Sequence, residues 1–295
     1  MPPKPTRLES ILRPCGIIWF SICCQNRLPS TTVHWQALKQ AIRQNGLAAL
    51  IHPAQIRDAA SAKLLSISCQ LQATPFLQCH ELYYTYSTKL TTIPAENFIA
   101  YEDTTIVPSL VKAANGMILE LGPGPGNQIH RFDSSLVQHI YGIEPNVHFR
   151  DTLDAKLGKH GLGDKYTLLS CGIEDSDVLR KEGIAEGSLD AVLCIQVLCA
   201  VRDPKIVMKE VWKLLKPGGK FIFWEHGWSR DRVTNVAQAC WNPAWSTFVG
   251  CELTRNVLGD ILSCGEWENP GEIEEPEEPF SLLPRIQGVL IKKKA

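Results

Sequence analysis

The sequence predicts an α/β fold over residues 98–295, with a mostly parallel sheet and helices on both of its faces. From Gly116 onward, short apolar runs alternate with helical patterns, which is typical of βαβ units. The most apolar run, Leu189–Val197, predicts a central strand that is buried on both faces. A glycine-rich turn at residues 122–126 joins the first predicted strand to the segment that follows it.

Each predicted element rests on its local pattern. Apolar runs predict strands at Met117–Leu121, Ile140–Glu144, Tyr166–Ser170, Leu189–Val197, Lys220–Glu225 and Ile286–Lys292. Helical periodicity predicts helices over Asn127–Gln138, Val147–Lys159 and Asp203–Leu215. The last of these begins with Asp203 as N-cap and Pro204 at its first position, and Lys216-Pro217-Gly218-Gly219 predicts a tight turn after it.

Residues 1–97 carry less pattern and are predicted to form a partly helical or disordered N-terminal extension. Val33–Leu50 has the periodicity of a helix that ends near a glycine. Ile11–Cys24 is apolar, but Arg13 and Pro14 interrupt it, and it is shorter than the ~20 residues that a spanning helix needs. A weak membrane-surface anchor, a buried helix and the remnant of a longer anchor remain as alternatives.

Composition limits the classes of partner. The formal net charge is −1, so no nucleic-acid partner is expected. The eleven cysteines form no CxxC pair, which argues against a zinc site and favours reduced thiols in an intracellular protein. The expected location is therefore the cytoplasm or the surface of an internal membrane such as the endoplasmic reticulum.

The most informative segment is Leu119-Glu120-Leu121-Gly122-Pro123-Gly124-Pro125-Gly126-Asn127. Its GxGxG spacing lets the backbone turn sharply and approach a ligand between a strand and a helix. The dinucleotide fingerprint needs GxGxxG, and Asn127 occupies the position of its last glycine, so nicotinamide chemistry is rejected. Glu120 does not suit a phosphate. It suits a ligand that carries an ammonium and a sulfonium group.

A second carboxylate lies at the end of the second predicted strand, in Tyr141-Gly142-Ile143-Glu144-Pro145-Asn146. A carboxylate at that place can accept hydrogen bonds from the two hydroxyls of a ribose. Together with Glu120 and the strand context, Glu144 turns a weak glycine motif into a strong one.

Four segments then resemble the successive motifs of class I S-adenosylmethionine-dependent methyltransferases: ELGPGPGN, GIEPN, SLDAVLCIQVLCAV and LLKPGGKF. VLCAV, Phe223-Trp224-Glu225-His226 and Gly250-Cys251-Glu252-Leu253-Thr254-Arg255 resemble the methyltransferase-like thiol methyltransferases and their fungal relatives. The resemblance covers residues 98 to 295. It implies a Rossmann-like, seven-stranded sheet and S-adenosyl-L-methionine as the cofactor.

The resemblance also implies a cofactor site. Glu120 and the three loop glycines match the part that contacts the methionine end, Glu144 matches the ribose ligand, and Cys171-Gly172-Ile173-Glu174 falls where the family places a turn against the adenine. Gly172 stands where an aspartate is usual, so backbone groups near Ile173 are expected to take over that contact. The full predicted set is Glu120, Gly122, Gly124, Gly126, Asn127, Glu144, Pro145, Ile173, Glu174, Cys194 and Gln196.

The candidate catalytic residues follow the fifth predicted strand. His226 is the candidate base, because a neutral-range pKa suits proton transfer, although a histidine that only hydrogen-bonds a loop fits equally. Glu225 either orients His226 or is a surface residue. No metal site is expected, since His226, Cys240 and Cys251 supply no close ligand pair.

Tryptophans concentrate after the fourth predicted strand. Trp228, Trp241 and Trp245 fall in Asp231–Thr254 or beside it, a segment predicted to be an irregular lid over the active site or a packed loop. Arg255 fits an acidic substrate group or a salt bridge.

The function that these observations favour is transfer of a methyl group to a thiol or hydroxyl of an apolar small molecule. Methyl transfer needs orientation and a water-poor pocket more than it needs a strong base. Two alternatives remain: an O- or C-methyltransferase of secondary metabolism, and a catalytically silent binding protein that keeps the fold.

Overall fold

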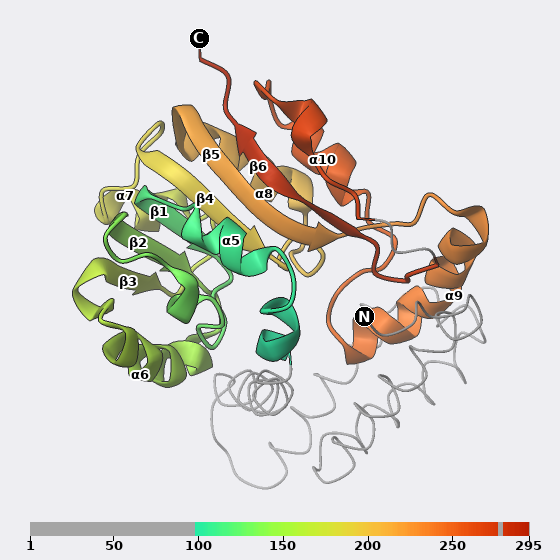
Figure 1. Cartoon of the computed structure of the whole chain (residues 1–295), viewed down its shortest axis with the longest axis horizontal. Coiled ribbons are helices and arrows are strands. Elements are labelled where there is room, and N and C mark those ends of the chain that lie inside the picture. Colours follow the sequence, from blue (N-terminus) through green and yellow to red (C-terminus); the bar gives the residue numbers. More distant parts are fainter. Residues whose placement is uncertain (1–97, 277–279, 295) are drawn as a thin grey trace, which may run out of the picture. The chain divides into compact units, whose positions relative to one another are not determined.

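The computed structural model describes residues 98–276 and 280–294, which fall into two compact units (Figure 1). The larger unit contains residues 98–227, 256–276 and 284–294, and the described part of the second contains 228–255 and 280–283. The predicted helix Val33–Leu50 and the apolar segment Ile11–Cys24 lie outside the described residues. The boundary predicted near residue 97 stays a prediction.

One mixed sheet forms the centre of the larger unit (Figure 1). Its strands are β1 (Gly116–Leu121), β2 (Val137–Ile143), β3 (Tyr166–Leu169), β4 (Leu189–Ile195), β5 (Leu215–His226) and β6 (Arg285–Ile291). They lie in the order β3-β2-β1-β4-β5-β6. The first five strands pair in parallel, and β6 runs antiparallel to β5. The predicted α/β class with a mostly parallel sheet is confirmed.

Helices connect the strands of the larger unit. They are α5 (Val107–Lys112), α6 (Arg150–His160), α7 (Ser176–Lys181), α8 (Pro204–Leu214) and α10 (Val257–Ser263), with short 3₁₀ turns η2 (Ile129–Arg131), η3 (Val147–Phe149), η4 (Gly163–Lys165) and η5 (Pro270–Glu272). Two of the predicted helices therefore exist close to their predicted bounds. The Asp203 side chain accepts from the backbone N–H of Lys205 at 2.9 Å, which confirms the predicted N-cap.

Alternating residues of the central strands build one core on each face of the sheet. Leu119, Val192 and Phe223 pack with residues of α8 and α10 in the first core. Their neighbours Ile118 and Leu193 pack with α5 and α6 in the second. A parallel sheet covered on both faces leaves the carboxyl ends of its strands as the natural place for a ligand.

The described residues contain six strands, where the resemblance implies seven. From Gly116 onward the sequence analysis predicts six strands, and each of them exists in the described residues. Between β5 and β6 the described chain forms α9 (Arg232–Phe248) and α10 instead. The strand count is thus corrected to six for the described residues.

The helix predicted over Asn127–Gln138 is also wrong. Ile129 and Phe132 are buried with helical spacing, but the helix is limited to the single 3₁₀ turn η2. The reason is local competition for the backbone, because Asp133 Oδ1 accepts from the N–H of Ser135 at 3.1 Å and from its hydroxyl at 2.6 Å. The chain then enters β2 at Val137.

The second unit contains α9, a helix of 17 residues in the segment predicted to be irregular. Asp231 begins it, since its carboxylate accepts from the backbone N–H of Thr234 at 2.9 Å, and Pro243 lies inside it. Trp245 is buried and donates to Cys251 Sγ at 3.1 Å, while Trp228 is half exposed. Among the described residues, no helix has both the length and the apolar character that crossing a membrane requires.

Replacing Asp203 tests the cap of α8. Asp203→Ala leaves the backbone N–H of Lys205 without its acceptor, so the free energy of unfolding should fall by about 1 kcal/mol. Urea denaturation measures the change. Lys205→Ala keeps the backbone N–H and serves as control, and equal losses in the two variants would contradict the capping role.

Candidate active site

A cavity of about 210 Å³ lies in the larger unit, where β1 and β4 end and the glycine-rich loop begins. Its lining combines apolar side chains with carboxylates, amides and loop backbone. The residues are Phe98, Glu102, Glu120, Leu121, Gly122, Pro123, Gly124, Pro125, Asn127, Gln128, Leu193, Ile195 and Gln196. The sequence-predicted residues that it brings together are Glu120, Gly122, Gly124, Asn127 and Gln196.

The loop takes a conformation that only glycine adopts without strain at several positions. Gly122, Gly124 and Gly126 have φ of +56°, +53° and +75°. A Cβ built on Gly124 meets nothing within 4 Å, so this position borders open space. The backbone of Gly124 can therefore approach a ligand closely.

Glu144 holds this loop against the end of β2. One oxygen, Oε2, accepts from the N–H of Gly124 at 3.0 Å, and the other accepts from the N–H of Asn146 at 2.9 Å. Each carboxylate oxygen can accept a second hydrogen bond, so both retain capacity for a hydroxyl. Burial raises the pKa of Glu144, and the two backbone hydrogen bonds oppose that rise.

Glu120 is a fully buried carboxylate on the central strand β1 and lines the cavity. The hydroxyl of Tyr166, at the start of β3, donates to its Oε2 at 2.7 Å. Gly142 on β2 makes this contact possible, because a Cβ there would lie 2.1 Å from the Tyr166 hydroxyl oxygen. Burial raises the pKa of Glu120 to about 7, the charge of Glu144 adds to the rise, and the Tyr166 hydrogen bond opposes it.

Two buried acceptors in the cavity lining have no hydrogen-bond partner within the part of the chain that the structure describes. They are Oε1 of Glu120 and Oδ1 of Asn127. A buried acceptor without a donor is unfavourable by about 1–3 kcal/mol, so such atoms point to a ligand that supplies donors. An ammonium group beside a sulfonium supplies both donors and positive charge, and the residues present therefore fit S-adenosylmethionine.

The remaining predicted cofactor residues are not in the lining of this cavity. Pro145 is exposed after Glu144, Ile173 is buried in the first core, and Glu174 is exposed in the turn after β3. Cys194 is fully buried in the same core, and Gly126 is buried at the end of the glycine-rich loop. Glu144 also lies outside the lining, although it holds the loop through Gly124. These contacts to the cofactor stay predictions.

Glu225, at the end of β5, is fully buried, so the alternative that it is a surface residue is wrong, and its role in orienting His226 stays a prediction. Its Oε1 accepts from the N–H groups of Val197 and Leu198 at 2.7 and 3.1 Å. The thiol of Cys194 donates to the same oxygen at 3.2 Å, and burial together with this carboxylate raises the pKa of Cys194 well above its usual value. Glu225 thereby fixes the turn after β4, where Gln196 has an unusual φ of +61°.

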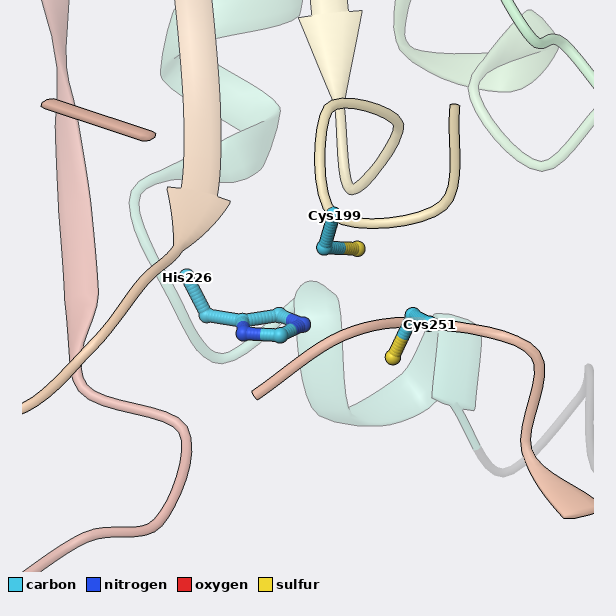
Figure 2. A group of neighbouring side chains, drawn as sticks. All are labelled: Cys199, His226 and Cys251. Atoms are coloured by element: carbon cyan, nitrogen blue, oxygen red, sulfur yellow. The ribbon is translucent and has the colours of Figure 1, made fainter. Parts of the chain in front are cut away.

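His226 ends β5 and is buried at 1% exposure. Figure 2 shows its ring beside Cys199, which lies in the turn after β4, and a ring nitrogen lies within 4.8 Å of Cys199 Sγ. Cys251, also drawn there, belongs to the unit that contains α9. The role of His226 as the catalytic base stays a prediction.

Sequence reasoning missed Tyr166, Glu102 and Gln128. Tyr166 appeared only as the first residue of a strand, and nothing in the sequence links it to Glu120. Phe98 and Glu102 are four residues apart, a spacing that places two side chains on the same face of a helix. The structure shows that residues 98–102 are helical.

Comparisons with known proteins agree with this geometry. The family model described as "Methyltransferase domain" matches residues 119–223. Thiol S-methyltransferase TMT1B of Rattus norvegicus is 30% identical over 181 residues, which are 59% of this chain and 70% of that protein. Thiol S-methyltransferase TMT1A of Homo sapiens is 42% identical over 141 residues, 47% of this chain and 54% of that protein.

A solved structure supports the fold alone. An O-methyltransferase family protein from Burkholderia thailandensis superposes with a TM-score of 0.51 at 15% identity, covering 95% of this chain and 72% of its own. With the loop, the two carboxylates and these relatives, the chain belongs to the S-adenosylmethionine-dependent methyltransferase family that includes the thiol S-methyltransferases.

Proposed function

We propose that the cavity binds the methionine part of S-adenosyl-L-methionine and that the enzyme methylates a thiol of an apolar small molecule. The observation that carries the proposal is the unpartnered, buried Oε1 of Glu120 beside the glycine loop. Gly122 and Gly124 supply backbone at close range, and Glu144 supplies acceptor capacity for the ribose.

The choice of acceptor rests on the relatives and on the chemistry. Several relatives are named thiol S-methyltransferases. A thiol with a pKa of ~8.5 is partly ionised at neutral pH, whereas a hydroxyl needs a base. Phe98, Leu193 and Ile195 give the cavity an apolar wall that favours an apolar acceptor.

When bound, the cofactor supplies a methyl group on a positively charged sulfur that is a good leaving group. The cavity residues Glu120, Gly122 and Gly124 would hold the cofactor, and that methyl group would be available to an acceptor thiolate. Glu120 offers its negative charge to the cofactor, and the apolar wall excludes water. His226 would take the thiol proton where the acceptor is not already ionised.

Cofactor binding tests the site directly. Isothermal titration with S-adenosylmethionine should show binding that Gly124→Arg abolishes, because the arginine fills the open space in front of a left-handed backbone. Gly183→Arg is the matched control, since Gly183 has φ of +83°, also has nothing within 4 Å of its Cβ position, and lies outside the cavity lining. A folded wild-type protein that does not bind would overturn the proposed site.

Glu120→Gln tests the charge. The wild-type Kd for S-adenosylmethionine should rise about tenfold between pH 8 and pH 6, because Glu120 with a pKa of about 7 becomes protonated over that range. The variant should bind weakly at both values, without this pH dependence. A wild-type Kd that stays constant would argue against Glu120 as the anionic ligand.

The same variant should be more stable than wild type at high pH. A carboxyl whose pKa rises from 4.5 to about 7 on folding binds more protons in the folded state, so it favours folding at low pH and loses that effect as pH rises through 7. This pKa shift lowers the wild type's free energy of unfolding by roughly 3 kcal/mol between low and high pH. The Tm of Glu120→Gln should therefore exceed that of wild type at pH 8, with a much smaller difference at pH 5.

The acceptor class and His226 are tested together. His226→Ala should lower the rate with aliphatic thiols at pH 7, and the rate should recover at pH 9, where the thiol ionises without help. His160→Ala, at the surface end of α6, is the control. Methylation of phenolic hydroxyls but not of thiols by the wild type would favour the O-methyltransferase alternative.

A further inference from the structure

Glu102 lies in the cavity but outside the residues that the methyltransferase family model matches. Residues 98–102 are helical, and Phe98 and Glu102 line the cavity from the same face of this segment. The exposure of Glu102 is 1%. A glutamate is rarely buried to this extent unless it is paired.

The carboxylate of Glu102 is held firmly in place. Gln128 Nε2 donates to its two oxygens at 3.3 and 3.2 Å, and Arg131 Nη1 donates to Oε2 at 2.8 Å. Arg131 also donates to the amide oxygen of Gln128. Among the described residues, Oε1 receives only the 3.3 Å hydrogen bond from Gln128, so it keeps capacity for a further donor.

The positive charge of Arg131 is shared between Glu102 and Asp103. Its Nε and Nη2 atoms donate to Asp103 Oδ1 at 2.9 and 2.7 Å, so two carboxylates share one guanidinium. His130 Nε2 lies 3.5 Å from Asp103 Oδ1, but burial lowers the pKa of His130 and favours its neutral form. With both carboxylates ionised, the cluster therefore carries a net negative charge next to the cavity. Burial raises the pKa of Glu102, which is the expected response of a carboxylate whose charge is not fully compensated.

Among the described residues, the lining of the cavity carries no positive charge. These residues include Glu102 and Glu120 but no lysine, arginine or histidine. Oε1 of Glu120 has no partner there. The complement to this wall is a cation with several N–H donors, and an ammonium group offers three.

We propose that Glu102, positioned by Gln128 and Arg131, is a second carboxylate that binds the α-ammonium of the cofactor's methionine part. The inference rests on the proposed cofactor site. It adds a binding residue from the segment before β1 and assigns the acidic wall of the cavity to the amino-acid end of the cofactor.

Two ligands separate this role from a structural one. S-adenosylhomocysteine carries the ammonium, whereas 5′-methylthioadenosine lacks the whole amino-acid part. In isothermal titration, Glu102→Gln should raise the Kd for S-adenosylhomocysteine at least tenfold, as expected for a lost charged hydrogen bond. The Kd for 5′-methylthioadenosine should change less than twofold.

Glu182→Gln is the control for the loss of one negative charge, because Glu182 is exposed and lies outside the cavity lining. It should leave both Kd values unchanged. If Glu102→Gln does not fold, Glu102→Asp is the second variant, because its shorter side chain keeps the negative charge but moves it away from the cavity. It should weaken the binding of S-adenosylhomocysteine by a smaller factor and leave the binding of 5′-methylthioadenosine unchanged.

The other outcomes are distinct. Equal weakening of both ligands by Glu102→Gln assigns Glu102 a structural role and overturns the inference. Unchanged binding of S-adenosylhomocysteine overturns it as well, while leaving the cofactor site intact. Absence of any S-adenosylhomocysteine binding by the folded wild type overturns the proposed function itself.

Discussion

The rest of the structure depends on a carboxylate buried in the central strand of the sheet. Glu120 stands among apolar residues of β1, where an uncompensated charge is strongly disfavoured. Three strands are shaped around it: β1 carries the carboxylate, β2 provides Gly142 as a gap, and β3 provides the Tyr166 hydroxyl that crosses the gap. Oε2 is satisfied in this way, and Oε1 has no partner among the described residues. The protein thus keeps the buried carboxylate of Glu120 in a place where a cationic ligand can bind to it.

A second buried carboxylate organises the neighbouring part of the same edge. Glu225 on β5 draws the turn after β4 inward through two backbone N–H groups, and Gln196 takes a left-handed backbone there. The side chain of Gln196 lies next to the guanidinium of Arg285, and the Cζ atom of Arg285 stacks 4.0 Å from the centroid of the Trp224 ring. The carboxyl edge of the sheet is therefore shaped by polar groups on strands whose remaining residues are apolar. Rigid strands hold these groups more accurately than loops could.

The sequence predicts the parts of this fold whose signals are local. Each of the six strands of the described residues contains a short, mostly apolar segment, and Asp203 has the residue type and position of a helix cap. The glycine loop, Glu120 and Glu144 could be assigned because spacing along one chain segment carries their chemistry. The helix after the loop could not, since hydrogen bonds of Asp133 compete with a periodic pattern. α9 was not predicted because Pro243, a residue that disfavours helices, lies inside it. The pairings of Glu120 with Tyr166 and of Glu102 with Arg131 depend on tertiary contacts between residues that are distant in the sequence.

The antiparallel pairing of β6 with β5 has a consequence for how the chain is made. On the ribosome β5 is synthesised before α9, α10 and β6, so the edge that β6 covers stays unpaired while those segments are added. β5 is rich in aromatic side chains, and an exposed apolar edge strand invites pairing with other chains. Residues Glu225 and His226 pair with Ile286 and Arg285, so this end of the sheet is completed late in synthesis. The nascent protein thus passes through a stage in which its sheet is open along one side, and chaperone binding at that stage would protect the edge.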